Sequence, residues 1–176
     1  MNKKNKFKIG LIGYGKWGKK IYKNLVKYKE LKVQVFSKHG KNLTKKIYNL
    51  NEMLSFDMVF IATNENRNSK FSNFMIQNDI NTVSEKPLFK KINLYRPLLK
   101  KKLFSFFRVN YIYAIYNEYI NLNKLINKKK IKKIFLFFSS TSKINSFERC
   151  KWEWAPHIFS IIDYYGLSEI RKLKIK

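Results

Sequence analysis

The chain has only one cysteine, Cys150, among its 176 residues. A single cysteine can form no disulfide within the chain and cannot build a zinc site from several thiolates. Cys150 could serve as a nucleophile, but an ordinary free thiol is the simpler interpretation. We therefore expect a protein of the reducing cytoplasm that holds no metal ion.

Long apolar segments are also missing. The basic residues 1–8 precede an apolar run that extends only from Ile9 to Ile12, which is too short for the core of a signal peptide. No stretch approaches the roughly 18 apolar residues of a membrane-spanning helix. The sequence therefore predicts no secretion signal and no membrane partner.

Acidic residues are scarce, with 11 Asp and Glu against 38 Lys and Arg, and the formal net charge is +27. Such a charge can indicate a polyanionic partner, either nucleic acid or a membrane surface. It can also reflect AT-rich codons, because Lys, Asn, Ile, Phe and Tyr make up more than half of the chain. Arginine, the usual base-reading residue, is rare, and the lysines are spread from Lys3 to Lys176. We favour the codon interpretation and predict no specific nucleic-acid partner, although weak, salt-sensitive binding to polyanions is compatible with it.

Three of the six glycines form a Gly-x-Gly-x-x-Gly pattern at Gly13, Gly15 and Gly18. The pattern follows the apolar run Phe7–Ile12 and precedes helically spaced apolar residues over 17–28. In a dinucleotide site the first glycine permits a tight turn, the second lets the backbone approach a pyrophosphate, and the third lets the helix pack on the strand. The pyrophosphate then lies at the helix N-terminus. The context therefore predicts a dinucleotide-binding turn.

Strand-like and helix-like segments alternate over the first 110 residues. The predicted strands are Phe7–Ile12, Val33–Phe36, Met58–Ala62, Thr82–Val83 and Leu103–Val109. The predicted helical segments are Trp17–Tyr28, short turns within Lys41–Leu54, Ser69–Asn78 and Ile92–Leu99. This βαβ rhythm with short connections predicts an α/β fold with a doubly wound parallel sheet, a Rossmann domain, over residues 1–110.

The pattern changes after Asn110. We predict a long helix over Ile112–Ile126, a strand over Ile134–Ser140, a helix over Pro156–Tyr165 that Gly166 ends, and the opening of another strand over Ile170–Ile175. These elements predict a partial second α+β domain over residues 111–176.

A second motif, Glu85-Lys86-Pro87, follows a predicted strand. Alone, Glu85 and Lys86 could be a surface pair. Together with the glycine turn, the motif resembles the hallmark of the glucose–fructose oxidoreductase/inositol dehydrogenase/rhizopine-catabolism (Gfo/Idh/MocA) family. Ile61-Ala62-Thr63 resembles that family's loop beneath the nicotinamide, and Trp152–His157 resembles its acid-x-x-x-His catalytic helix. The chain corresponds to about the first half of such an enzyme, and the resemblance implies that residues 111–176 are part of its substrate-binding and oligomerisation domain.

The resemblance implies an NAD(P)-dependent oxidoreductase that transfers hydride with a sugar, cyclitol or nucleotide-sugar. Lys86 would contact cofactor and substrate, His157 would be the general acid/base, and Glu153 would stand one helical turn before it. A histidine titrates near working pH, and a lysine cation favours a developing alkoxide. Alternatively, His157 is a plain helix residue behind Pro156. The residues expected to bind the cofactor are Gly13, Gly15, Lys16, Trp17, Gly18, Ser37, Lys38, Ala62, Thr63, Asn64, Glu85 and Lys86.

Several positions depart from the family pattern. Ser37 and Lys38 follow the second strand, where an NAD site normally has an acidic residue for the ribose 2′-hydroxyl. We therefore favour NADP over NAD, unless this segment is only a loop. The family's proline is Asn64 here, its loop histidine is Asn68, and the acid after the helix histidine is Ile158. The alternative function is a cofactor-binding remnant without turnover, and an uncovered sheet edge would favour a homo-oligomer.

Overall fold

The computed structural model describes residues 6–38, 46–89, 104–111, 121 and 147–164. The chain forms two compact units, Met1–Asn110 and Tyr111–Lys176, which are described separately below. Among the described residues, no helix combines the length and the apolar character needed to cross a membrane.

The first unit is built on a six-stranded parallel sheet with the order β3-β2-β1-β4-β5-β6. Its strands are β1 (Phe7–Ile12), β2 (Leu31–Phe36), β3 (Lys46–Ile47), β4 (Met58–Ile61), β5 (Thr82–Glu85) and β6 (Phe107–Asn110). The chain adds strands outward from β1 to β3 and then returns to the other side of β1 with β4. This order is that of a doubly wound Rossmann sheet and confirms the predicted fold class.

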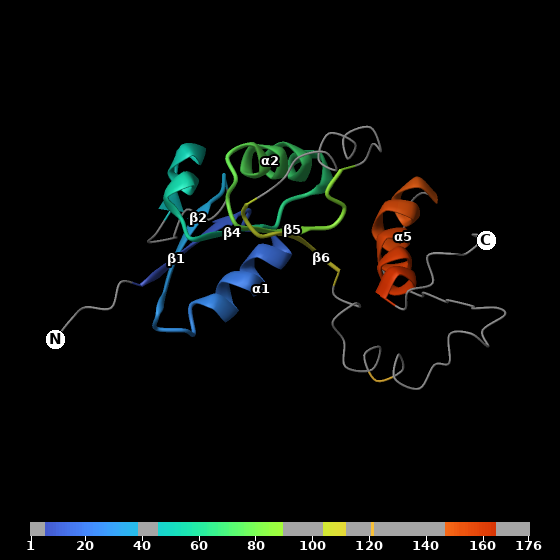
Figure 1. The fold of residues 1–176 in the computed structure, drawn as a ribbon, viewed down its shortest axis with the longest axis horizontal. Helices are drawn as coiled ribbons and strands as arrows, with labels where there is room; N and C mark the ends of the chain where they lie inside the picture. The colour runs from blue at the N-terminus through green and yellow to red at the C-terminus, as the bar shows by residue number, and fades with distance from the viewer. Residues whose placement is uncertain (1–5, 39–45, 90–103, 112–120, 122–146, 165–176) are drawn as a thin grey trace. The chain divides into compact units, whose positions relative to one another are not determined.

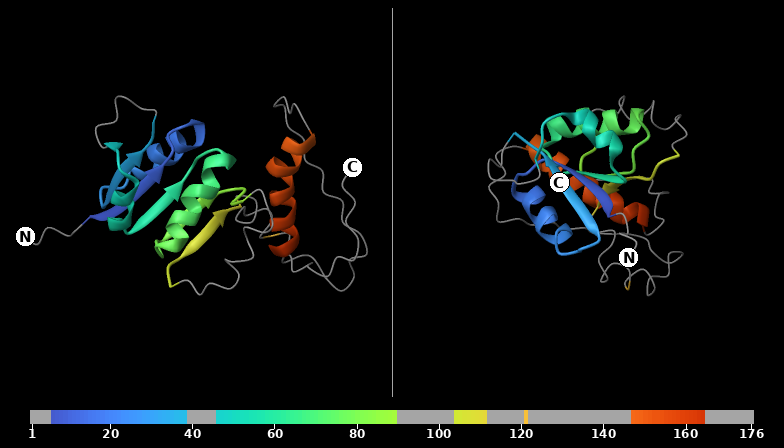
Figure 2. Two further views of the ribbon diagram at one scale, coloured as in Figure 1. Left: turned by 90° about the horizontal axis from the view of Figure 1, so that it is seen from above. Right: turned by 90° about the vertical axis from the view of Figure 1, so that its left-hand side faces the viewer.

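Helices cover both faces of this sheet (Figures 1 and 2). The helix α1 (Lys16–Leu25) lies on one face, and the 3-10 helix η1 (Leu50–Ser55) and the helix α2 (Glu65–Gln77) lie on the other. Alternate strand residues therefore enter two different cores. Leu11 and Val35 pack toward α1, whereas Ile12 and Val59 join the larger core beneath η1 and α2. Because both faces are buried, the central strands β1, from Ile9 on, and β4 are continuously apolar, whereas β2 and β5 include polar residues.

The element boundaries differ from the predicted ones in understandable ways. The two-residue strand β3 was not predicted, and β6 begins at Phe107 rather than Leu103. The helix α2 begins at Glu65 rather than Ser69, because the Asn64 side chain caps it by accepting a hydrogen bond from the backbone N–H of Arg67 at 3.2 Å. The helix α1 ends at Leu25, three residues early. The expected helical turns within 41–54 are η1.

Side-chain hydrogen bonds join the loops at the N-terminal edge of the sheet. Asp57 accepts from the backbone N–H of Lys8 at 2.6 Å, and Asn81 donates to the Asp57 carbonyl at 2.9 Å. Asp79 accepts from the hydroxyl and the N–H of Ser105, at 2.7 and 3.1 Å. These bonds fix the connections at the end of the sheet opposite to the glycine turn.

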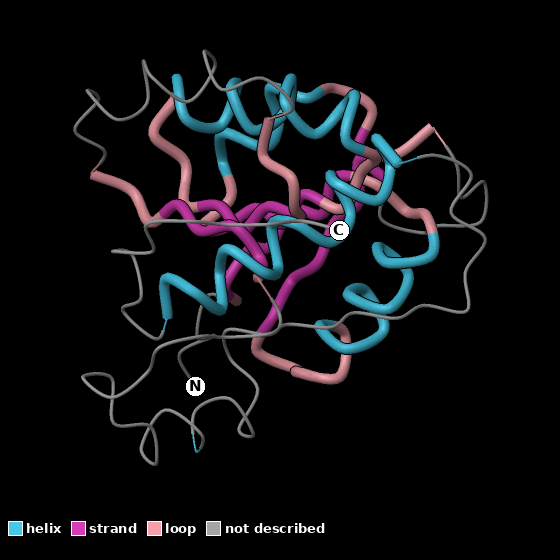
Figure 3. The backbone as a smooth tube through the Cα atoms, turned by 90° about the vertical axis from the view of Figure 1, so that its right-hand side faces the viewer, coloured by secondary structure: helices cyan, strands magenta, loops and turns pink. Residues whose placement is uncertain are grey.

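The described part of the second unit consists of Tyr111, Asn121 and the helix α5 (Phe147–Tyr164), one of the helices drawn in cyan in Figure 3. The prediction that this helix starts at Pro156 is wrong, since Pro156 lies inside the helix. That prediction relied on the preference of proline for the first helical turn, but a helix can continue through a proline at the loss of one hydrogen bond. The predicted helices over Ile92–Leu99 and Ile112–Ile126, the strands over Ile134–Ser140 and Ile170–Ile175, and the stop at Gly166 lie outside the described residues, apart from Asn121.

Candidate functional site

Four loops meet at the C-terminal edge of the parallel sheet. The register pairs Ile12 with Phe36 on one side and with Ile61 on the other, and Ile61 pairs with Ser84. The residues that follow these strand ends therefore lie at one edge. They are the predicted cofactor residues Gly13–Gly18, Ser37 and Lys38, Ala62–Asn64, and Glu85 and Lys86. In open α/β sheets this edge, at the point where the strand order reverses, is where ligands bind.

Two of the three glycines are required by packing. Gly13 has a φ of +99°, and a Cβ atom added there would overlap the carbonyl oxygen of Ala62. Gly18 is buried in α1, and a Cβ atom on it would overlap the carbonyl oxygen of Gly13. The N–H of Gly13 also donates to the Phe36 carbonyl at 2.9 Å. These contacts hold the turn against the ends of β2 and β4.

The third glycine faces open space. A Cβ atom on Gly15 would meet nothing within 4 Å, although Gly15 is the N-cap of α1. No side chain caps this helix and its first turn carries no acidic residue. A helix N-terminus with free space beside it and only lysines nearby, at Lys16 and Lys19, offers backbone N–H groups to an anion. The geometry therefore fits the pyrophosphate of a dinucleotide.

Thr63 adds a polar group beside this turn. Its Oγ1 atom is buried and has no hydrogen-bond partner among the described residues. Its Cγ2 atom would lie 2.9 Å from a Cβ atom on Gly13, so the two residues are adjacent. Buried hydroxyl groups are normally satisfied, and a bound ligand is one way to satisfy this one. The neighbouring Asn64 already has a role as the cap of α2.

Asn68 holds the Glu-Lys-Pro segment in place. It lies on α2, not in a loop, and is fully buried. Its Nδ2 atom donates to the carbonyls of Glu85 and, at 3.0 Å, Pro87. Its Oδ1 atom accepts from the hydroxyl of Ser84 at 2.8 Å and of Ser72 at 3.3 Å. Lys86 therefore lies between two residues whose carbonyls are anchored to α2.

The other side of this segment contacts β6. The Glu85 carboxylate accepts a hydrogen bond from Asn110 Nδ2 at 2.7 Å, and the Lys86–Pro87 peptide bond is cis. The sequence analysis noted Asn68 only as a departure from a family pattern and did not predict its partners Ser72 and Ser84. The available signal was the placement of polar Asn68 and Ser72 one turn apart, on the same helix face as the apolar Met75 and Ile76.

The remaining predicted catalytic residues belong to the second unit. Glu153 and His157 both lie on α5, one turn apart, and His157 is buried. Ser160 donates to the His157 carbonyl at 2.8 Å. Lys86 belongs to the first unit, so its convergence with Glu153 and His157 stays a prediction. In the described part of the chain, no group of three or more His, Cys, Asp or Glu residues could hold a metal ion.

Comparisons with known proteins identify the fold. No protein-family model matches the sequence, and no curated protein matches it. Solved structures do match: a Gfo/Idh/MocA family oxidoreductase from Vibrio cholerae has a TM-score of 0.57, with 18% identity over 65% of this chain and 42% of that one. An apo scyllo-inositol dehydrogenase from Lactobacillus casei has a TM-score of 0.61, with 19% identity over 73% and 43%. A biliverdin reductase from Synechocystis, solved with biliverdin and NADP+, has a TM-score of 0.58, with 15% identity over 73% and 45%.

These structures include the family that the sequence motifs resemble, and they confirm the resemblance at the level of the fold. The chain spans less than half of the length of each of the three.

The three glycines predict three different mutant phenotypes. Gly13→Ala should destabilise the protein by about 2–5 kcal/mol, through backbone strain and overlap with Ala62. Gly18→Ala should cost about 1–3 kcal/mol through overpacking. Gly15→Leu should cost about 1 kcal/mol or less, because the side chain enters open space, yet it should abolish binding of a dinucleotide. Urea unfolding combined with NADPH titration by fluorescence separates the three. A folded Gly15→Leu variant with wild-type affinity would contradict this assignment of the turn.

Asn68 is expected to be a stability hot spot. Asn68→Ala removes four hydrogen bonds, two to carbonyls and two from the Ser72 and Ser84 hydroxyls, which still bond each other. It should lower the free energy of unfolding by about 3 kcal/mol. Asn78→Ala is a matched control at the end of the same helix, because it removes one exposed hydrogen bond, to Phe74. We expect the control to cost less than about 1 kcal/mol in the same urea titration. Equal losses for the two variants would show that the Asn68 network does not clamp the segment.

Proposed function

We propose that this chain is the dinucleotide-binding part of a Gfo/Idh/MocA-type oxidoreductase that transfers hydride between NAD(P) and a sugar, cyclitol or nucleotide-sugar. The observation that carries the proposal is that the three glycines of the turn have different surroundings. Gly13 and Gly18 are packed against backbone, whereas Gly15 faces open space at the N-terminus of α1. A turn that merely connected β1 to α1 would not need a third glycine where a side chain has room.

In this proposal the first unit holds the cofactor. The start of α1 would bind the pyrophosphate, Ser37 and Lys38 would face the adenosine ribose, and the segments after β4 and β5 would lie along the nicotinamide. When bound, the nicotinamide supplies or accepts the hydride. Lys86 would hold a positive charge near the substrate oxygen, favouring the alkoxide form. The clamp from Asn68 would keep this part of the backbone from shifting, which preserves its distance to the substrate.

The proton would be handled by the second unit. His157 would accept the proton of the substrate hydroxyl during oxidation and return it during reduction, because imidazole titrates near working pH. Glu153, one turn earlier on α5, would orient the imidazole and stabilise its charged form. We further propose that the reaction takes place in the cytoplasm and that the protein self-associates.

NADP is the cofactor we favour, on the basis of the residues after β2. The strand ends at Phe36, and the next residues are the partly buried Ser37 and the exposed Lys38. An acidic residue at this point would repel a 2′-phosphate, whereas a hydroxyl and an ammonium group can bind one.

Replacing Lys38 tests this preference. Lys38→Ala should weaken NADPH binding by about tenfold and leave NADH binding nearly unchanged, because only the 2′-phosphate offers the ammonium group an anion. Lys32→Ala is the control, since Lys32 is an exposed lysine near the start of β2, the strand that precedes Lys38, and is farther from the site. Fluorescence titration of both cofactors gives the two dissociation constants. An unchanged ratio between them in the Lys38 variant would refute the NADP preference.

Replacing His157 tests the acid/base assignment. His157→Ala should lower kcat by about 10²–10⁴-fold and leave the NADPH dissociation constant unchanged, because the glycine turn lies in the other unit. Asp163→Asn changes an exposed group on the same helix and should have no effect on turnover. Oxidation of a panel of sugars and cyclitols, followed by NADPH absorbance, provides the rates. Cofactor binding without turnover on any substrate would favour the alternative, a binding protein with no catalytic activity.

A further inference from the structure

Among the described helices of the first unit, an excess of positive charge is found on α1 alone. The helix α1 carries Lys16, Lys19, Lys20 and Lys23 and no acidic residue. In the layer on the opposite face of the sheet, η1 and α2 together carry two basic residues, Arg67 and Lys70, and two acidic ones, Glu52 and Glu65. Their formal charges cancel, 2 − 2 = 0, whereas α1 alone has a formal charge of +4. Other lysines of the first unit, such as Lys8, Lys32 and Lys70, lie on other elements, so α1 is a local cluster within a generally basic chain.

The lysines of α1 form a continuous stripe. Residues 16, 19, 20 and 23 recur at the spacing of one helix face, and Lys27 follows at the same spacing just beyond the helix. All five lysines are exposed, and the opposite side of α1 packs on the sheet through Gly18, Ile21 and Tyr22. We name these five lysines, 16, 19, 20, 23 and 27, the α1 lysine stripe. No acidic residue occurs before Glu30 in the sequence, so nothing local on the chain neutralises the stripe.

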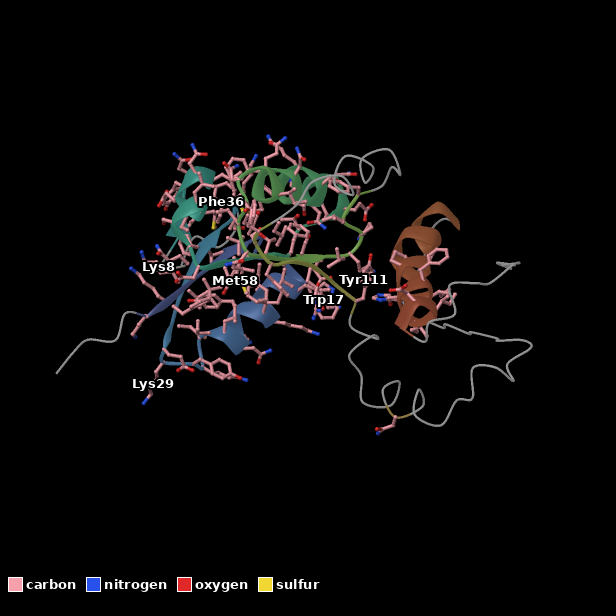
Figure 4. All side chains as sticks on the ribbon, in the orientation of Figure 1. Lys8, Trp17, Lys29, Phe36, Met58 and Tyr111 are labelled. Atoms are coloured by element: carbon pink, nitrogen blue, oxygen red, sulfur yellow. The ribbon has the colours of Figure 1, made fainter. Side chains whose placement is uncertain are left out.

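Exposed aromatic side chains lie at both ends of the stripe. Trp17 is 54% exposed at its start and Tyr28 is 56% exposed at its end. In Figure 4, Trp17 and Lys29 mark the two ends of this segment. The ammonium group of Lys20 lies 4.6 Å from the centre of the Trp17 ring, which keeps the indole beside the stripe. Lysines in a row with exposed aromatic rings are the combination that binds single-stranded nucleic acid, through phosphates and base stacking.

We propose that the α1 lysine stripe is a docking surface for the phosphate backbone of single-stranded nucleic acid, without sequence preference. A membrane surface fits less well, because a helix that binds bilayers inserts its apolar face, and the apolar face of α1 is occupied by the sheet. Sequence-specific recognition is not expected, because the side chains that usually read base edges are nearly absent from α1. The helix contains no arginine, and Asn24 is its single asparagine. The α1 lysine stripe and the proposed cofactor site beside Gly15 share one lysine, Lys16. The other four lysines of the stripe are not part of the proposed cofactor site.

The test compares two variants of the full chain with equal changes in charge. The stripe variant carries Lys→Gln at 19, 20, 23 and 27, and leaves Lys16 intact because it lies at the proposed cofactor site. The control variant carries Lys→Gln at 8, 32, 46 and 70, which lie on other elements. Binding of a fluorescent oligothymidine is followed by anisotropy as the salt concentration is raised. Circular dichroism establishes that both variants fold.

The stripe variant should lose four phosphate contacts with a single strand. The negative slope of log K against log salt concentration should therefore be shallower by about three than in the wild type. At about 50 mM salt we expect that variant to lose at least tenfold in affinity and the control to lose much less. A fluorescent oligonucleotide of mixed sequence should bind the wild type equally well. Equal losses in the two variants would overturn the proposal, because binding would then follow net charge alone.

A measurement on the wild type does not depend on variant folding. Acetylation of lysines with and without oligothymidine, read by mass spectrometry, should show protection at 19, 20, 23 and 27 but not at 8, 32, 46 and 70. Protection confined to the second set would refute the proposal. Stripe-dependent binding to phosphatidylserine vesicles, with no binding to oligothymidine, would instead identify a membrane surface and would also overturn it.

Discussion

The close approach of backbone to backbone where β1 turns into α1 is the constraint on which the site depends. Gly13 lies against Ala62 at the end of β4, and Gly18 in α1 lies against Gly13. Three elements are thereby held together without any side chain between them. Because this contact fixes where α1 begins, it also fixes the direction of the helix N–H groups and the position of the space beside Gly15.

A second polar cluster extends the same arrangement to the neighbouring strand. Asn68 and Ser72 on α2 bond to Ser84 on β5 and to the carbonyls around Lys86. Four of these five bonds are buried and the fifth, to the Glu85 carbonyl, is partly buried, so losing the cluster would leave polar groups in a mainly apolar interior. The backbone on both sides of Lys86 is therefore positioned by its hydrogen bonds to a packed helix.

Much of the first unit could be predicted from the sequence, since its central strands β1 and β4 are largely apolar and its glycine turn has a recognisable spacing. The β1 and β4 strands, α1 and the parallel order follow from that pattern. The start of α2 was missed because Asn64 was assigned to the cofactor rather than to a helix cap. The start of α5 was predicted wrongly because Pro156 was taken as the first residue of the helix. Proline prefers the first helical turn, but it can also occur inside a helix, as it does here. The place of Asn68 on the apolar face of α2 indicated a buried polar group, but its partners at residues 84–87 could not be predicted, because they lie 16 to 19 positions away in the sequence.

The hydrogen bonds at the N-terminal edge of the sheet help to explain how the fold tolerates so large an excess of lysine over acidic residues. Asp57 and Asp79 accept bonds from backbone N–H groups and a serine hydroxyl, donors that carry no formal charge. These two aspartates thus tie the loops together through bonds to uncharged donors. Lysines on the surface of α1 can accumulate or disappear without disturbing these connections, which leaves the surface charge free to change under selection for a partner while the fold stays the same.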